Sequence, residues 1–472
     1  MTLRLHDTLS GETRPFVPLR DDGVGVYSCG PTVYGPAHIG NFRSFLFADL
    51  LIRHLRWRGY AVTWVMNITD IDDKIIRGAA ATGEDIGTVA ERYLATFLAD
   101  AAALRMTTPD VMPRATRHID QIVALIETLL ERGHAYRTDD GSIFYRIASW
   151  PAYGRLARLD PEGLRVGERV EADEYGKDDV RDFALWKGPK RGEPVWETAI
   201  GPGRPGWHIE CSAMGMAHLG PSFDLHTGGV DLIFPHHEDE IAQSEAATGQ
   251  TFVGTWLHCA HLQASGTKMA KSTGNIARVG EVLASGVSAR ALRLALISVH
   301  YRAGLNHSTD SLAAAAAALD RLDAAVAALG GYVEDGPDDP EIPERLAAAR
   351  TDFGEALDDD LNVSAGLAVV FDLVRDLNRR IERRSMSTAD AGRAVETLRE
   401  IDQVLGILPD PEPVDRLDPA ISALLEARVE ARASRDFAAS DRLRDELAEL
   451  GVTVEDTRDG QRWRRTVEVG HG

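Results

Sequence analysis

A strand–helix–strand pattern near the N-terminus constrains the fold more than any other feature of the sequence. Val24–Ser28 alternates in the manner of a short strand, a helical pattern covers Gly40–Arg56, and the apolar run Ala61–Met66 follows as a buried strand. Two strands joined through a helix make a parallel pair with a right-handed crossover. Ligands of such sheets bind at the carboxyl ends of the strands, where Cys29 and Asn67 stand. The pattern therefore predicts a parallel sheet with a ligand site at this edge.

The chain has 472 residues, a length typical of two to four domains, so further elements are expected after this unit. Between about residues 109 and 205, an amphipathic helix (Ile119–Arg132) precedes a polar stretch that we interpret as an insertion into the sheet domain. Sheet-like material is predicted to resume at Trp207. The other elements expected in this domain are a strand at Phe223–His226, a helix at Pro235–Ala247, a strand at Trp256–Gln263 and a polar loop at Ala264–Asn275.

The C-terminal third is predicted to be mainly helical. Helical patterns continue from Ser288, four prolines within Pro409–Pro419 mark a linker, and two helices (Ala420–Ala433 and Ala439–Leu450) precede a hairpin over residues 452–469. We therefore expect a sheet domain over residues 1–310 with the insertion at 109–205, a helical bundle over 311–408 and a small mixed α/β module over 409–472.

Composition excludes several classes of protein. Hydrophobic residues make up 44% and charged residues 26%, as in globular proteins, and no apolar run reaches the roughly 18 residues of a membrane span. The N-terminus lacks the apolar core of a secretion signal, so we expect a cytoplasmic protein that is not associated with a membrane. The net charge of −21 argues against non-specific polyanion binding. Three cysteines without C-x-x-C spacing exclude a disulfide framework.

A first candidate anion site lies where a strand turns into a helix, at Gly35–Asn41. Backbone N–H groups at a helix N-terminus attract phosphate, and Gly40 permits close approach of a ligand. His38 and Asn41 add side-chain donors three residues apart. The pattern is short, so a turn whose histidine merely caps the helix remains an alternative.

A second candidate anion site is the run Lys268–Ser272 inside the glycine-bracketed loop Gly266–Gly274. Two lysines three residues apart, Lys268 and Lys271, can close over a triphosphate and neutralise charge in the transition state. The alternative is a solvated surface loop.

Soft metal ligands are distributed over three segments. Cys29, Cys211, His236 and Glu240 provide two thiolates, an imidazole and a carboxylate, which suit Zn²⁺. His236 and Glu240 are four residues apart and share a helix face, whereas His237 is expected to point about 100° away. The alternative is two buried cysteines and a polar helix start. Cys259, within an apolar strand, is interpreted as core.

Together these motifs resemble one family. Cys29–Tyr34 leading into His38–Asn41 is similar to the HIGH element of class I aminoacyl-tRNA synthetases, and Lys268–Ser272 is similar to their KMSKS loop. Pro205–Ser212 and Gly228–Glu238 resemble the cysteinyl-tRNA synthetase family in particular. The likeness runs essentially from end to end of the chain.

The resemblance implies a Rossmann-type catalytic domain with a connective insertion, a helical bundle and an anticodon-binding module. It implies one Zn²⁺ on Cys29, Cys211, His236 and Glu240, and ATP with Mg²⁺ as substrate. The implied catalytic residues are His38, Asn41, Lys268 and Lys271. ATP or the adenylate would be held by His38, Gly40, Asn41, Gly229, Asp231 and Lys271, and the amino-acid pocket would be lined by Thr32, Asn67, Thr69 and Trp207.

Two positions depart from the family's pattern. Asn41 replaces the final histidine of the HIGH element, and it can donate a hydrogen bond but cannot carry charge. Ala270 replaces the middle serine of the KMSKS loop, which removes a hydroxyl and keeps both lysines. We expect modest consequences from each.

The implied activity is ATP-dependent formation of cysteinyl-adenylate from L-cysteine and transfer to cysteine tRNA, by a monomer. One alternative is a ligase that joins cysteine to an amino-sugar, as in mycothiol synthesis, but such relatives lack the anticodon module. The other is a non-catalytic tRNA-binding paralogue, which should have lost the lysine loop or a zinc ligand. Neither is missing here.

Overall fold

The computed structural model describes residues 2–159, 181–264, 267–268, 277–410, 419–457 and 460–465. The chain forms two compact units, Met1–Leu408 and Pro409–Gly472. In the first unit the strands are β1 (Arg4–Asp7), β2 (Glu12–Pro15), β3 (Val24–Ser28), β4 (Val62–Met66), β5 (Ala135–Arg137), β6 (Ile143–Tyr145), β7 (Phe183–Lys187), β8 (Arg204–Pro205), β9 (Phe223–Gly229), β10 (Val253–Cys259), β11 (Leu262–Ala264), β12 (Thr267–Lys268) and β13 (Leu305–His307). Its α-helices are α1 (Ile39–Trp57), α2 (Asp73–Thr82), α3 (Ile86–Ala103), α4 (Ile119–Glu131), α5 (Trp207–Leu219), α6 (Glu238–Thr248), α7 (Val279–Ala284), α8 (Ala289–Ile297), α9 (Thr309–Gly330), α10 (Ile342–Asp358), α11 (Val363–Arg383) and α12 (Thr388–Leu405).

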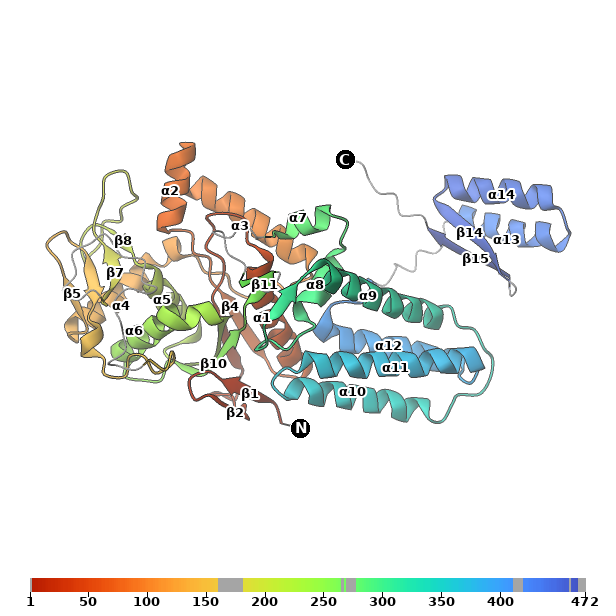
Figure 1. The fold of residues 1–472 in the computed structure, drawn as a ribbon, viewed down its shortest axis with the longest axis horizontal. Coiled ribbons are helices and arrows are strands. Elements are labelled where there is room, and N and C mark those ends of the chain that lie inside the picture. The colour runs from red at the N-terminus through yellow and green to blue at the C-terminus, as the bar shows by residue number, and fades with distance from the viewer. Residues whose placement is uncertain are drawn as a thin grey trace. The chain divides into compact units, whose positions relative to one another are not determined.

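The first unit is built on a parallel sheet with the strand order β10-β9-β3-β4 (Figure 1). The predicted strand–helix–strand unit is confirmed, because β3 and β4 pair in parallel on either side of α1 in the chain. Since β3 connects to β4 on one side and pairs with β9 on the other, the strand order reverses at β3. The carboxyl ends of β3 and β9 therefore form the crevice where open α/β sheets bind ligands.

Side chains from the sheet alternate between two buried layers. Val26 and Trp64 belong to the cluster that contains α1, whereas Tyr27 and Val65 belong to the cluster that contains Met214 of α5. All four side chains are fully buried. The sheet is thus covered on both faces, as is usual for parallel sheets in α/β proteins.

The insertion has its own sheet, which the sequence did not predict. Strands β5, β6, β7 and β8 form an antiparallel sheet in that order, and α4 packs with them in a separate core. In Figure 1 this insertion and the helices α9–α12 lie on opposite sides of the central sheet. The predicted helix Ile119–Arg132 is confirmed as α4.

Three element predictions need correction. The sheet-like material expected at Trp207 is the helix α5, whose apolar residues lie on all sides because both the sheet and the insertion bury it. The helix expected from Pro235 begins only at Glu238, after an irregular turn over Ile233–His237. The strand expected over Trp256–Gln263 is divided into β10 and β11, which belong to different sheets.

The chain from α8 to α12 is mainly helical, as the helical patterns after Ser288 predicted, and only the short strand β13 interrupts it within the described residues. Asp49 of α1 and Arg293 of α8 form a fully buried ion pair at 2.7 Å where α1 packs against these helices. Arg293 also donates to the carbonyl of Leu405 in α12. One arginine therefore ties α8 to α1 and to α12.

The second unit contains α13 (Pro419–Ala433), α14 (Phe437–Glu449) and the antiparallel hairpin β14 (Val452–Thr457) and β15 (Gly460–Arg465). Both predicted helices are confirmed, and so is the hairpin over residues 452–457 and 460–465, whereas residues 458–459 and 466–469 lie outside the described residues. A small core of its own joins α13, α14 and β14. Among the residues the structure describes, no helix of either unit has the length and apolar character needed to span a membrane.

Candidate active site and metal centre

Four candidate metal ligands meet at the carboxyl edge of the central sheet. Cys29 directly follows β3, Cys211 lies in α5, and His236 and Glu240 come from the turn before α6 and from its first turn. The Sγ atoms of Cys29 and Cys211 are 3.9 Å apart, and Cys29 Sγ lies 3.7 Å from Glu240 Oε1. His236 Nε2 lies 3.1 Å from the same carboxylate oxygen.

These distances fit a tetrahedral metal site. With Zn–S bonds of about 2.3 Å, two ligand sulfurs in a tetrahedron lie about 3.8 Å apart. One ligand atom from each of Cys29, Cys211, His236 and Glu240 lies within 4.8 Å of all the others. All but the half-buried Cys29 are fully buried, so solvent does not compete for them.

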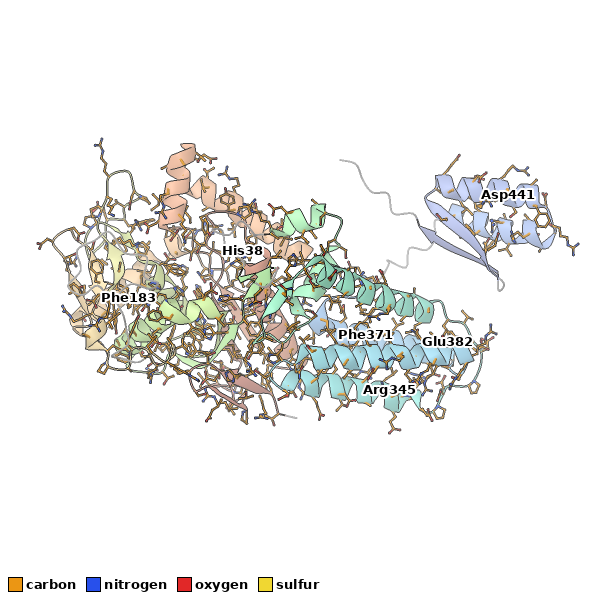
Figure 2. All side chains as sticks on the ribbon, in the orientation of Figure 1. His38, Phe183, Arg345, Phe371, Glu382 and Asp441 are labelled. Carbon is orange, nitrogen blue, oxygen red and sulfur yellow. The ribbon has the colours of Figure 1, made fainter. Side chains whose placement is uncertain are left out.

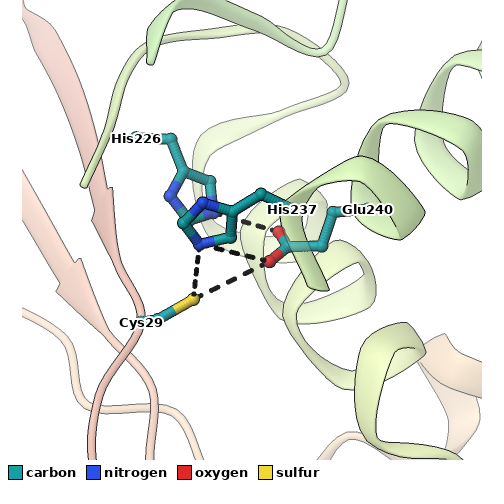
Figure 3. Close-up of side chains that lie close together, drawn as sticks. All are labelled: Cys29, His226, His237 and Glu240. Atoms are coloured by element: carbon teal, nitrogen blue, oxygen red, sulfur yellow. Dashed lines mark hydrogen bonds and ion pairs between the residues drawn. The ribbon is translucent and has the colours of Figure 1, made fainter. Parts of the chain in front are cut away.

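A second set of donors overlaps the first and contains Cys29, His226, His237 and Glu240. Figure 3 shows these side chains converging, with Cys29 coming from the sheet side and Glu240 from α6. His226 Nε2 lies 3.0 Å from Glu240 Oε2, and His237 Nε2 lies 3.3 Å from Cys29 Sγ. Both separations are hydrogen-bond lengths, so these histidines are placed to orient Glu240 and Cys29.

The expectation that His237 points away from the cluster is wrong. His237 does project in a different direction from His236, but it lies three residues before Glu240, a spacing that also places two side chains on one helix face, and its Nε2 lies 4.0 Å from Glu240 Oε1. The ring of His237 lies against Gly228, where a Cβ would come within 2.6 Å of its Cε1 atom. Only glycine at position 228 allows the ring to reach Cys29.

A hydrogen-bonded chain supports His237 from behind. His237 Nδ1 lies 2.7 Å from His258 Nε2, and His258 Nδ1 lies 2.8 Å from Thr8 Oγ1. Because a metal-binding thiolate only accepts hydrogen bonds, His237 Nε2 must donate to Cys29, and its Nδ1 then accepts from His258. The chain fixes the ring that faces the sulfur. The sequence analysis did not single out His258 or Thr8, because neither is close in sequence to the candidate metal ligands.

The ionisable groups of this cluster shift one another's pKa values. Burial raises the pKa of Cys29, whereas the hydrogen bond from Cys29 lowers the pKa of Cys211. Burial alone would lower the pKa of His236, but Cys211 and Glu240 raise it to about 10. Burial alone would raise the pKa of Glu240, but His226 and His236 lower it to about 2. Protons here offset negative charge, a role that a divalent cation can also fill.

The predicted pocket residues lie beside the cluster, at the ends of β3 and β4. The Gly30 N–H donates to Asn67 Oδ1 at 2.9 Å, and a Cβ on Gly30 would lie 1.8 Å from the Asn67 carbonyl oxygen. Thr32 and Thr69 face each other across a parallel bridge. The ring of Trp207 stacks on His236 at 4.3 Å between centroids and keeps 38% of its surface exposed.

Glu210 belongs to the same group and was missed by the sequence analysis. Its Oε2 accepts a hydrogen bond from Thr69 Oγ1 at 3.1 Å, and the side chain is 1% exposed. Burial, followed by the acids Cys211, Asp72 and Asp70, raises its pKa well above the usual range. The feature of the sequence that could have identified Glu210 is its position next to Cys211.

The start of α1 carries the first predicted anion site, and Figure 2 labels His38 there. His38 is the N-cap residue: its Nδ1 accepts from the Asn41 N–H and its own N–H donates to Asn41 Oδ1, both at 3.1 Å. A Cβ on Gly40 would lie 2.9 Å from His38 Nδ1. The histidine therefore does cap the helix, and the same arrangement presents the N-terminus of α1 at the carboxyl edge of the sheet.

Of the other residues predicted to bind the nucleotide, all but Lys271 lie in described segments. Gly229 is the last residue of β9, and a Cβ at this position would lie 3.4 Å from Ser44 Oγ of α1. Asp231 follows, and the Oδ1 atom of its half-exposed side chain lies 3.8 Å from His261 Nδ1. Lys268 ends β12, which pairs with β11. Lys271 lies outside the described residues. Cys259 is buried in the core beside Arg43, as predicted, and belongs to neither donor set.

Comparison with known proteins agrees with this architecture. A family profile described as the tRNA synthetases class I (C) catalytic domain matches residues 15–317, the DALR domain matches 352–409, and the cysteinyl-tRNA ligase anticodon binding domain matches 414–464. The chain is 48% identical to a cysteine–tRNA ligase of Alkalilimnicola ehrlichii and 45% identical to one of Solibacter usitatus. Each match covers 98% of this chain and 100% of the relative.

Solved structures with this fold include a methionyl-tRNA synthetase of Mycobacterium tuberculosis (TM-score 0.56, 18% identity, 88% of this chain and 96% of that one). A leucyl-tRNA synthetase complex of Agrobacterium radiobacter is similar as well (TM-score 0.58, 12% identity, 85% of this chain and 88% of that one). These likenesses show the Rossmann-like class I fold. With the full-length matches to cysteine–tRNA ligases, they show that the chain belongs to the cysteinyl-tRNA ligase family of class I aminoacyl-tRNA synthetases.

Proposed function

We propose that the chain activates L-cysteine with ATP and Mg²⁺ to cysteinyl-adenylate and transfers the cysteinyl group to cysteine tRNA. The observation that carries the proposal is the pair of thiols, Cys29 and Cys211, in a buried soft donor set at the ligand-binding edge of a class I sheet. The donor set would contact the sulfur that distinguishes cysteine from other amino acids.

Cys29, Cys211, His236 and Glu240 would hold one Zn²⁺. When bound, this ion supplies a soft Lewis acid that takes a thiolate as ligand and disfavours the hydroxyl of serine. His226 and His237 would orient Glu240 and Cys29 by hydrogen bonds. Trp207, stacked on His236, would cover the amino-acid pocket that Thr32, Asn67 and Thr69 line.

The nucleotide would bind where α1 begins. The backbone N–H groups of α1 favour phosphate, and His38, Gly40 and Asn41 shape this end of the helix. Gly229 and Asp231 would contact ATP or the adenylate from the end of β9. The substrate carboxylate attacks the α-phosphorus and pyrophosphate leaves, with Lys268 and Lys271 meeting the charge that develops.

The C-terminal module would bind the anticodon. The match of residues 414–464 to an anticodon binding domain favours tRNA over an amino-sugar as acceptor. Together with the matches of residues 15–317 and 352–409, it supports our division into a catalytic domain (1–310), a bundle (311–408) and an anticodon module (409–472). We further propose a cytoplasmic monomer.

Two assays on metal-analysed protein test the proposal. Cysteine-dependent ATP–pyrophosphate exchange measures activation, and charging of cysteine tRNA measures transfer. We expect one zinc per chain, exchange with cysteine far above exchange with serine, and charging of cysteine tRNA. Exchange without tRNA charging, together with ligation of cysteine to an amino-sugar, would support the alternative ligase.

A further inference from the structure

The proposed amino-acid pocket has two walls that come from distant parts of the chain. Asn67 and Thr69 form one wall, in the segment that leads from β4 to α2. Trp207 forms the other wall, at the start of α5 and just after the insertion. The separation of the two walls therefore depends on how the insertion is held against the segment before α2.

Two buried cations of the insertion face each other across a strand pair. Lys187 ends β7, Arg204 begins β8, and the two residues are direct partners in the antiparallel register. Their side chains are only 11% and 4% exposed. Like charges in this position repel each other and are costly to bury, so the pair needs carboxylates nearby.

Asp73, the first residue of α2, supplies a carboxylate from outside the insertion. Lys187 Nζ donates to its Oδ2 at 2.8 Å, and Arg204 donates to its Oδ1. Burial alone would raise the pKa of Asp73, but Lys187 and Arg204 lower it below its ordinary value. Glu193 of the insertion accepts from Arg204 Nε at 2.7 Å. The ionised Asp73 thus ties the end of the insertion to α2.

The path from Arg204 to Trp207 is short and closely packed. The second of the two residues between them, Gly206, donates its N–H to the Leu185 carbonyl at 2.9 Å. A Cβ on Gly206 would lie 1.9 Å from the Ala184 carbonyl oxygen, so the backbone lies directly against β7. A displacement of Arg204 would therefore move Trp207 with it.

We propose that Asp73 is a positioning residue for the reaction: by pairing with Lys187 and Arg204, it holds Trp207 at a fixed distance from the opposite wall of the pocket. The inference rests on the proposed function, because it requires an amino acid to bind between the two walls. Asp73 is assigned no contact with the substrate.

The other end of the insertion is tied to the same segment by a separate carboxylate. Asp70 accepts the N–H of Thr116 at 3.0 Å and its hydroxyl at 2.6 Å. This contact does not involve Asp73. Asp73→Asn should therefore loosen the end of the insertion that carries Trp207 and leave the other end attached.

The test measures the KM for cysteine and the KM for ATP in ATP–pyrophosphate exchange, together with zinc content, on full-length proteins. The variants are Asp73→Asn, Trp207→Leu and the double variant. Glu84→Gln is a matched control, because Glu84 follows the other end of α2 and pairs through both carboxylate oxygens with Arg92 of α3, at 2.8 and 2.9 Å.

We expect Asp73→Asn to raise the KM for cysteine about tenfold, because a small displacement of a substrate-positioning group is costly. The KM for ATP and the zinc content should stay as in wild type, since the nucleotide binds at the start of α1. Because Asp73 acts through Trp207, Asp73→Asn should raise the KM for cysteine little further in the Trp207→Leu protein. Glu84→Gln should match wild type.

A milder variant carries the same test when Asp73→Asn does not fold. Lys187→Met removes one of the two cations and leaves the pair of Asp73 and Arg204, so it should raise the KM for cysteine in the same direction but by less. Its effect, too, should be lost in the Trp207→Leu protein.

Equal rises in the KM for cysteine and for ATP, or additive effects of Asp73→Asn and Trp207→Leu, would overturn the inference. So would a wild-type KM for cysteine in Asp73→Asn or, where that variant does not fold, in Lys187→Met. A wild-type protein without cysteine-dependent exchange would instead refute the proposed function, so the two failures are distinguishable.

Discussion

At the scale of single residues, a substitution of Cys211 distinguishes between the two donor sets that could hold a metal in the buried cluster. Only the donor set with His236 contains Cys211, whereas the set with His226 and His237 does not. We expect Cys211→Ser to lose most of its zinc and to lower cysteine-dependent exchange by on the order of 100-fold or more, since loss of a ligand should exceed the loss of an outer-shell partner. Cys259→Ser should keep its zinc. Full zinc content in Cys211→Ser would favour the second donor set.

His237 is predicted to act on the metal site through Cys29. His237→Ala removes the N–H that faces the sulfur, and we expect zinc to bind roughly 10–100-fold more weakly while the fold is retained. Competition with a chelator measures the affinity, and circular dichroism checks the fold. His218→Ala, which alters an exposed histidine at the other end of α5, is the control and should bind zinc like wild type. Unchanged affinity in His237→Ala would contradict this role.

At the scale of elements, the junction of α1 and α8 depends on Asp49 and Arg293. Asp49→Asn leaves Arg293 buried with an uncompensated charge, so we expect the free energy of unfolding to fall by about 3–5 kcal/mol. The exposed pair of Asp372 and Arg375 serves as control, and Asp372→Asn should cost at most about 1 kcal/mol. Urea unfolding of both variants measures the difference, and equal effects would argue against a special role of the junction.

The same pair predicts a pH dependence. Burial alone would raise the pKa of Asp49, but Arg293 and Arg53 lower it below its ordinary value. A lowered carboxyl pKa stabilises the fold fully above the unfolded pKa of about 3.9, and this stabilisation is lost as pH falls through the folded pKa. The difference in unfolding free energy between wild type and Asp49→Asn should therefore be constant near neutral pH and shrink in acid. A difference that grows in acid would contradict the assignment.

The lysine loop is predicted to act in the transition state. Lys271 stands between glycines in the sequence, so we expect the loop to close after ATP has bound. Lys271→Ala should lower the rate of activation far more than it weakens ATP binding. Rapid measurement of adenylate formation over a range of ATP concentrations separates the two effects. Equal losses in rate and affinity would assign Lys271 to ground-state binding.

At the scale of the whole molecule, activation and tRNA recognition should be separable. Among the residues that the structure describes, the core clusters of the first unit contain none beyond Leu408, and every proposed metal, pocket and nucleotide residue lies before it. A chain ending at Leu408 should keep cysteine-dependent exchange, which needs no tRNA. Charging of cysteine tRNA should fall sharply and become indifferent to changes in the anticodon. Normal charging by the shortened chain would show that residues 409–472 do not bind the anticodon.

Much of this protein could be predicted from local patterns. The apolar strands around α1 specify a parallel pair because their spacing permits few other packings, and they also place Cys29 and Asn67 at one edge. Cys211, His236 and Glu240 stand out because thiolate, imidazole and carboxylate are the side chains that Zn²⁺ binds. The resemblance to cysteinyl-tRNA synthetases rests on such short runs, and the full-length matches confirm it.

Only the tertiary structure decided which other side chains join them. Helical periodicity separates His237 from His236, but the His237 ring still reaches Cys29 because Gly228 leaves room for it. Burial on all sides hid α5, since a helix apolar all round has no periodic face to detect. Glu210 gained its meaning only when Thr69, distant in the chain, came within hydrogen-bond distance. Local sequence specifies which elements form and which chemistry they carry, whereas contacts between distant segments select the side chains that act together.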